Sequence, residues 1–123
     1  MPFTCKVGDT FCLADSSGHH RYVILTKPNG DGNIVLTNFT SAEAWKDCSV
    51  IFRPRDNKKL FTKRTTIDYS YATLISASKL MESEINNYVF CDLDCVRRIV
   101  EGALQSQHTP LEIVKELKSQ YST

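Results

Sequence analysis

The sequence predicts a mainly β protein with helices at its C-terminal end, an α+β fold built on a small antiparallel barrel. Three observations predict it. Short runs of β-branched and aromatic residues, separated by turn residues, fill the first three quarters of the chain. Apolar residues recur at helical spacing after residue 92. A length of 123 residues suits one domain, with the barrel over about residues 6–80 and a helical hairpin over about 92–121.

The first half of the chain predicts three strands and one clear turn. Residues 9–14 alternate between apolar and polar side chains, as a half-buried strand does. Residues 21–27 and 34–39 are rich in β-branched and aromatic side chains. Between them, Pro28-Asn29-Gly30-Asp31-Gly32 is a turn sequence whose glycines can adopt positive φ. The two strands that flank it should form a hairpin.

Three further strands are predicted before the helices begin. They cover residues 48–52, 61–67 and 72–75. Pro54 should prevent the first of these from continuing, because proline cannot donate to a strand ladder. Short strands joined by short turns favour an antiparallel barrel over a parallel α/β sheet.

Helical patterns dominate the last third. Residues 76–87 form a weak helical candidate, and Asp92 is a plausible N-cap for a stronger one. Thr109-Pro110-Leu111-Glu112 combines a threonine cap, proline at the first position and a glutamate three residues after the threonine. The predicted buried stripes consist of Leu93, Val96, Ile99, Val100, Ala103 and Leu104 in one helix and Leu111, Val114, Leu117 and Tyr121 in the next.

The charge is nearly balanced overall, at +1, but it is unevenly distributed. One segment, here called the basic loop, covers residues 53–64. It contains Arg53, Arg55, Lys58, Lys59, Lys63 and Arg64 against a single acid, Asp56. Such a segment can attract phosphates even in a nearly neutral protein, although a solvated loop is the simpler interpretation.

The cysteines and the apolar runs indicate the cellular environment. Five cysteines cannot all pair within the chain, which favours reduced thiols and a cytoplasmic location. No apolar run approaches the roughly 20 residues that span a bilayer, so no membrane association is expected. Cys91 and Cys95 have a spacing compatible with zinc, but buried small side chains explain them better, and no metal or other cofactor is predicted.

The predicted hairpin brings polar residues together at one end. Arg21 precedes one strand, and Thr40 and Ser41 end the next. Arginine can hold phosphate oxygens bidentately, and hydroxyls can donate to a phosphate or to a developing oxyanion. His19 and His20 titrate near neutral pH, and only one of them should face the site because neighbours on a strand point opposite ways. A solvated arginine, turn histidines and a Ser/Thr turn are the alternatives.

Other residues are candidates for contact with RNA. They are Lys27 on the same hairpin, the six cations of the basic loop, His19, and Trp45 in a polar segment. An exposed tryptophan can stack on a base or anchor a protein partner.

These motifs resemble the PemK/MazF toxin family. Val7-Gly8-Asp9-Thr10-Phe11 is similar to the family's opening strand. Gly18-His19-His20-Arg21, followed by an apolar run, is similar to its G-x-R-P-hydrophobic segment, with Tyr22 in place of the usual proline. Residues 34–41 resemble its strand ending in Thr or Ser. The resemblance covers about residues 6–80.

The resemblance implies an SH3-like barrel, usually dimeric, that cleaves single-stranded RNA without a metal and is blocked by an antitoxin protein. Arg21 would match the catalytic arginine, and Thr40, or Ser41 after a one-residue slip, the catalytic hydroxyl. The RNA 2′-hydroxyl would be the nucleophile. His20 or Asp68 would move protons, with Asp68 a loose candidate because the family's later segment is not recognisable.

Two classes of function follow. The first is a toxin-like endoribonuclease, a hydrolase of a toxin–antitoxin or defence locus. The second is a non-catalytic barrel that binds a protein or nucleic acid.

Overall fold

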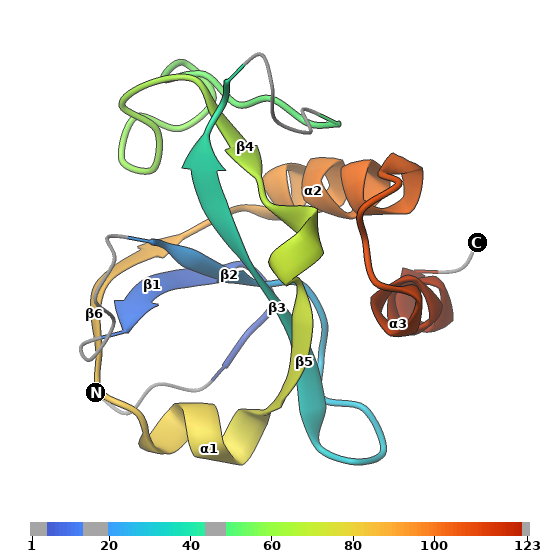
Figure 1. The fold of residues 1–123 in the computed structure, drawn as a ribbon. Coiled ribbons are helices and arrows are strands. Elements are labelled where there is room, and N and C mark those ends of the chain that lie inside the picture. The colour runs from blue at the N-terminus through green and yellow to red at the C-terminus, as the bar shows by residue number, and fades with distance from the viewer. Residues whose placement is uncertain (1–4, 14–19, 44–48, 122–123) are drawn as a thin grey trace.

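An antiparallel sheet forms the centre of the molecule (Figure 1). The computed structural model describes residues 5–13, 20–43 and 49–121. Within them the strands are β1 (Asp9–Leu13), β2 (Tyr22–Ile24), β3 (Asn33–Ser41), β4 (Thr65–Ile67), β5 (Thr73–Ser76) and β6 (Ile85–Phe90). Their order is β4-β3-β2-β1-β6, with β5 also paired to β3. With three helices among the described elements, two of them at the C-terminal end, the predicted mainly β, α+β class is confirmed.

The long strand β3 organises this sheet. One edge pairs with β2, in the register Val23↔Thr37. The other edge pairs first with β5 and then with β4, and the 3-10 turn η1 (Tyr69–Tyr71) joins those two strands. Because β3 runs past β2, its last residues face β4. The polar end of β3 therefore lies beside the chain that follows the basic loop.

The turn between β2 and β3 has the predicted chemistry. Gly32 adopts a φ of +77°, and its N–H donates to the Asn29 carbonyl at 2.9 Å. The Asn29 side-chain oxygen accepts from the N–H groups of Asp31 and Asn33. β2 ends at Ile24, earlier than predicted, yet Leu25 N–H still donates to Val35 O at 3.0 Å. The turn therefore fixes the hairpin register.

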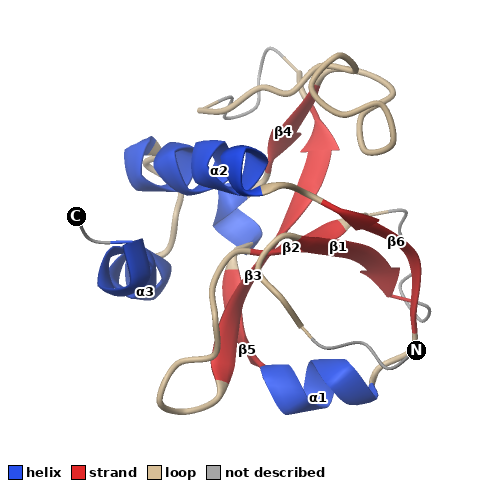
Figure 2. Cartoon of the chain, turned by 180° about the vertical axis from the view of Figure 1, so that it is seen from behind, coloured by secondary structure: helices blue, strands red, loops and turns tan. Residues whose placement is uncertain are grey.

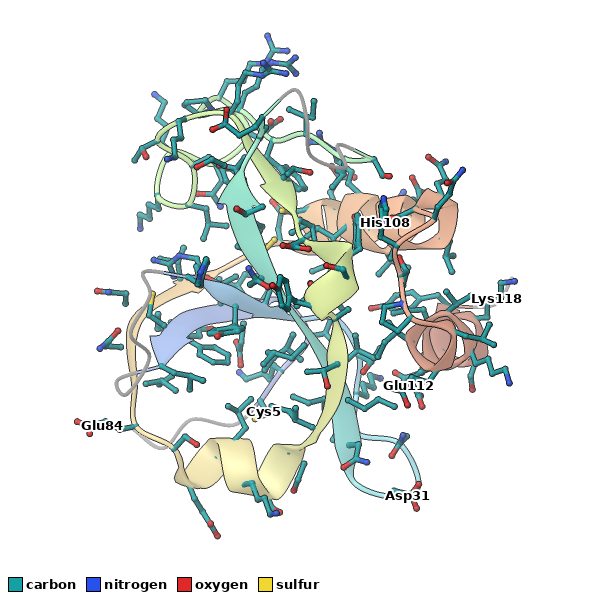
Figure 3. All side chains as sticks on the ribbon, viewed as in Figure 1. Cys5, Asp31, Glu84, His108, Glu112 and Lys118 are labelled. Atoms are coloured by element: carbon teal, nitrogen blue, oxygen red, sulfur yellow. The ribbon has the colours of Figure 1, made fainter. Side chains whose placement is uncertain are left out.

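Helices cover both faces of the sheet. They are α1 (Ala77–Glu82), α2 (Leu93–Gln105) and α3 (Leu111–Tyr121), and α2 and α3 lie on the side away from α1 (Figure 2). Val23 packs in the core with α2 and α3, whereas its neighbour Ile24 packs in a second core beneath α1. Cys5, labelled in Figure 3, belongs to this second core. No helix in the described ranges is long and apolar enough to cross a membrane.

Side-chain hydrogen bonds fix α2 and α3. The Asp92 carboxylate accepts from Cys95 N–H at 2.9 Å, which confirms the predicted cap of α2. The Thr109 hydroxyl donates to the Ala103 carbonyl at 2.7 Å, so it ties the start of α3 to the end of α2. The Gln120 side chain bonds both backbone groups of Lys27, each at 2.9 Å. α3 is thereby docked on the base of the β2–β3 hairpin.

Two predicted strands are wrong or too long. Of the predicted strand at 48–52, residue 48 lies outside the described residues, and in the rest only Phe52 pairs, as an isolated bridge to Thr65. The predicted strand at 61–67 is reduced to β4. Residues 62–64 are exposed and polar, so burial provides no reason for them to join the sheet.

The helix predicted over residues 76–87 is correct only in its first half. α1 ends at Glu82, because Ser83 adopts an extended conformation, and β6 follows. Tyr88, Val89 and Phe90 are good β formers, and β1 offers them a free edge.

The buried stripes are also partly wrong. Leu93, Leu104 and Leu111 are exposed, whereas Ile113 is buried in place of Leu111. Leu93 and Leu111 are each the first residue of a helix, and the buried residues of both helices lie in the turns that follow. Ile113 and Leu117, four residues apart, form the buried face of α3.

Candidate functional site

The paired ends of β2 and β3 form the base of the candidate site. Tyr22 pairs with Asn38, and Phe39 N–H donates to the Arg21 carbonyl at 2.9 Å. Arg21 therefore lies opposite Phe39. Continuing this antiparallel register by one residue places His20 near Thr40. This juxtaposition agrees with the hairpin predicted from the turn.

A surface pocket of about 320 Å³ opens at this end. Its walls come from the start of β2, the end of β3, the basic loop and β4. The described residues that line it are His20, Arg21, Phe39, Thr40, Ser41, Leu60, Thr62, Lys63 and Thr65. Four of the five predicted catalytic residues thus share one pocket.

The pocket has a cationic character. Arg21 and Lys63 supply two positive charges, and His20 adds an imidazole. No described lining residue is an acid. Cations gathered in a hollow without a neutralising carboxylate attract anions. The pocket can therefore hold a phosphate.

Arg21 is anchored on one side. Its Nη1 donates to Thr10 Oγ1 at 3.1 Å and to the backbone carbonyl of Asn87. A guanidinium has five N–H donors, so three of them, on Nη2 and Nε, lie outside these two bonds. Arg21 is half-buried and lines the pocket.

Hydroxyls and apolar groups form the opposite wall. Thr40 and Ser41 are half-buried at the end of β3, paired with Thr66 and Thr65 of β4. Phe39 and Leu60 give the pocket an apolar portion. Sites that bind small organic groups commonly combine an apolar surface with a few polar donors. The arrangement suits a phosphate attached to a larger organic group.

The basic loop is fixed by one arginine of α2. Arg98 donates to the Asp56 carboxylate at 3.2 Å and to the Ile51 carbonyl at 2.6 Å, and its guanidinium lies 4.3 Å from the centre of the Phe52 ring. The Arg53 N–H also donates to Asp56, at 2.7 Å. That backbone bond, and then Arg98, lower the pKa of the Asp56 carboxyl. Asp56 is therefore a fixed anionic anchor of the loop.

The cations of the basic loop lie at the surface. All six are exposed, and Lys63 also lines the pocket. Figure 3 shows nitrogen-tipped side chains around this loop, while the labelled acids Asp31, Glu84 and Glu112 lie at other parts of the molecule. A flexible anionic chain that enters the pocket would pass these cations.

Several predicted site residues lie elsewhere. Lys27 is at the other end of the hairpin, with its backbone bonded to α3. Asp68 does not line this pocket, and its carboxylate accepts from Ser70 at 2.7 Å. His19 and Trp45 fall outside the residues that the structure describes. Of the two predicted proton-transfer residues, His20 lines the pocket and Asp68 does not.

Three lining residues were not predicted as site residues. Leu60 and Thr62 belong to the basic loop and Thr65 to β4, and they join the pocket because β4 pairs with the end of β3. These three residues are uncharged and belong to no site motif that the sequence analysis identified.

Cys91 and Cys95 lie close together at the start of α2. Across the described ranges, no group of three or more His, Cys, Asp or Glu side chains is placed to hold a metal ion. A hydrogen bond with Cys95, together with burial, raises the pKa of the Cys91 thiol. Metals bind the thiolate form of cysteine, whereas the surroundings of Cys91 favour the protonated thiol.

Comparisons with protein-family models, curated proteins and solved structures find no match to this chain. The function is therefore argued from the pocket itself.

Proposed function

We propose that this protein is a metal-independent endoribonuclease that cleaves single-stranded RNA, of the PemK/MazF toxin type. One observation carries the proposal: His20, Arg21, Thr40, Ser41 and Lys63 line one pocket, in which no described lining residue is acidic. Cations, hydroxyls and an imidazole are the groups that phosphodiester cleavage requires when no metal takes part.

The proposed reaction is an internal displacement at phosphorus. The RNA 2′-oxygen attacks the adjacent phosphorus and loses its proton, while the bond from phosphorus to the 5′-oxygen breaks and that oxygen gains a proton. The products are a 2′,3′-cyclic phosphate and a free 5′-hydroxyl. Arg21 neutralises the charge that grows on the phosphate oxygens, and Thr40 or Ser41 donates a hydrogen bond to them. His20 transfers protons.

The basic loop is proposed to guide the RNA backbone. Its six cations are exposed and one of them, Lys63, lines the pocket. Phosphate contacts of this kind position a strand without reading its sequence. Single-stranded RNA fits this surface, because the strand must bend to place one phosphate in the pocket.

The partners and the location belong to this proposal as well. A toxin of this type acts in the cytoplasm, is held inactive by an antitoxin protein and pairs as a homodimer. A small antitoxin-like neighbour in the same operon would support this setting.

A non-catalytic binding module is the second candidate. It is favoured by the two hydrogen bonds that tie Arg21 Nη1 to Thr10 and Asn87, because such bonds also serve a purely structural role. This candidate predicts RNA or protein binding at the basic loop without cleavage.

The deciding experiment incubates a long, mixed-sequence single-stranded RNA with the protein in EDTA and maps the product ends. Wild type should cut at a short recurrent motif and leave cyclic phosphates. Arg21→Ala and Thr40→Val should abolish or strongly reduce cleavage, whereas Arg97→Ala, which removes an exposed arginine of α2, should not. Cleavage that persists in a folded Arg21→Ala protein contradicts the assignment. No cleavage by the wild type favours the binding module.

A further inference from the structure

We propose that an irregularity in the edge strand β6, together with Thr10 of β1, is a seat that positions the Arg21 guanidinium for cleavage. This inference rests on the proposed function. It assigns Thr10 and Asn87 as positioning residues, because neither is among the residues that line the pocket.

The irregularity is a β-bulge. The pairs Thr10↔Val89 and Cys12↔Asn86 enclose one residue of β1, Phe11, and two residues of β6. Asn87 is the first of those two and adopts a φ of +55°. In the described chain, Cys5 is the only other non-glycine residue with positive φ. Asparagine tolerates this conformation better than most residues, and bulges are common beside active sites.

The bulge presents a backbone carbonyl to Arg21. In a regular antiparallel ladder the backbone carbonyls point perpendicular to the strands, within the plane of the sheet. Here the Asn87 carbonyl accepts a hydrogen bond from Arg21 Nη1, which reaches over β1 from the start of β2. The positive φ and the arginine contact therefore occur at the same residue.

Thr10 supplies the second acceptor in a fixed orientation. Its side chain is fully buried, and its hydroxyl donates its one proton to Val89 O at 2.6 Å. A hydroxyl that has used its proton can only accept, so the lone pairs of Oγ1 are left for Arg21 Nη1 at 3.1 Å. The bond to Val89 of β6 thus makes the Thr10 hydroxyl an acceptor for Arg21.

The seat leaves the reactive side of the guanidinium for a ligand. Both protons of Nη1 are used by Thr10 and Asn87, and the protons of Nη2 and Nε are not part of these bonds. A cation that is already oriented needs little reorganisation when negative charge develops on the phosphate. Displacement of a catalytic group by about 1 Å can reduce a rate roughly a hundredfold.

The test compares Thr10→Val, Thr10→Ser and a matched control, Thr26→Val. Thr26 is also fully buried, and its hydroxyl accepts from Val35 N–H at 2.9 Å, but it does not line the pocket or contact Arg21. Single-turnover cleavage is measured at saturating enzyme and at a temperature where melting curves show every variant folded. We expect Thr10→Val to slow cleavage about tenfold to a hundredfold, and Thr10→Ser and Thr26→Val to remain near the wild-type rate.

A second comparison separates positioning from stability. In an Arg21→Ala background, Thr10→Val should reduce the residual rate no further, because the group that it positions is gone. A wild-type rate in Thr10→Val, or an equal loss in Thr26→Val, overturns the proposal.

A third measurement does not depend on activity. Nitrogen-15 NMR of the arginine side chains should show slowed solvent exchange of the Arg21 Nη1 protons in the wild type and faster exchange in Thr10→Val only. Fast exchange in the wild type refutes the seat even if RNA is cleaved. Slow exchange without any cleavage by the wild type refutes the proposed function and, with it, the catalytic purpose of the seat.

Discussion

Gly102 of α2 packs closely against Tyr69 of η1 and against Val50, and its replacement by alanine should destabilise the protein. A Cβ at this position would lie 2.3 Å from the Tyr69 hydroxyl oxygen and 3.2 Å from Val50 Cβ. The same hydroxyl donates to the Ile99 carbonyl of α2 at 2.7 Å and is buried. The added methyl group therefore cannot be accommodated without moving Tyr69.

The expected magnitude combines three effects. Alanine favours the helix by about 1 kcal/mol relative to glycine. Overpacking of a tight interface costs about 1–3 kcal/mol, and loss of the Tyr69–Ile99 hydrogen bond costs about 1 kcal/mol more. Gly102→Ala should thus lower the free energy of unfolding by about 1–3 kcal/mol, although the same substitution on an exposed helix face would raise it. For a chain of 123 residues, the melting temperature should fall by roughly 4 °C per kcal/mol.

Urea unfolding of Gly102→Ala, Tyr69→Phe and the double variant measures this effect. Tyr69→Phe removes the atom in the closest contact, and the next contacts, the ring Cζ and Val50 Cβ, are both at 3.2 Å. The double variant should therefore be less destabilised than the sum of the single variants by about 1–3 kcal/mol. Additive losses, or a Gly102→Ala protein as stable as the wild type, would refute this account of the α2 interface.

Two further predictions concern polar contacts near the site. The hydrogen bond to the Asp9 carboxylate, at 2.6 Å, raises the pKa of Tyr88 to about 12 from an ordinary value of 10.0. The fold favours the neutral phenol, so the contribution of Tyr88 to the free energy of unfolding is complete below pH 10 and is lost as the pH rises toward 12. Melting temperatures should therefore fall more steeply between pH 10 and pH 12 in the wild type than in Tyr88→Phe. Arg98→Met should keep the stem of the side chain over Phe52 but release Asp56 and the Ile51 carbonyl. We expect Arg98→Met to show faster tryptic cleavage within the basic loop and weaker RNA binding than the control variant Arg97→Met. Equal tryptic cleavage of the two variants would show that Arg98 does not hold the loop.

The part of the site that lies on the β2–β3 hairpin could be predicted from the sequence. The Asn29-Gly30-Asp31-Gly32 turn is local chemistry, and it fixes which residues of the two strands face each other. Given that register, Arg21 had to lie beside Phe39, and the polar residues after it had to gather at one end. The placement of Lys27 follows from the same register, because it sits at the turn end of its strand. A shared hairpin alone therefore did not justify grouping it with Arg21.

The second half of the sheet could not be predicted in the same way. Residues 76–87 contain a short helix and the beginning of an edge strand, and an apolar pattern of a few residues fits either one. Which one forms depends on β1, whose free edge is more than 70 residues away along the chain. Asp68 is a similar case. Its side chain turns to Ser70 because η1 reverses the chain there, and no local pattern marks that turn.

The strand β6, which the sequence pattern did not predict, is also the strand that binds the Arg21 guanidinium. Arg21 and Asn87 are 66 residues apart, and their contact exists only because β6 pairs with β1 and bulges beside Thr10. The resemblance to the toxin family covers about residues 6–80, so it ends before this strand begins. Motif similarity can thus place an arginine at the start of β2, but it cannot say whether the guanidinium is oriented. In this chain, that orientation is set by the bulge in β6, and activity should depend on β6 as much as on the motif.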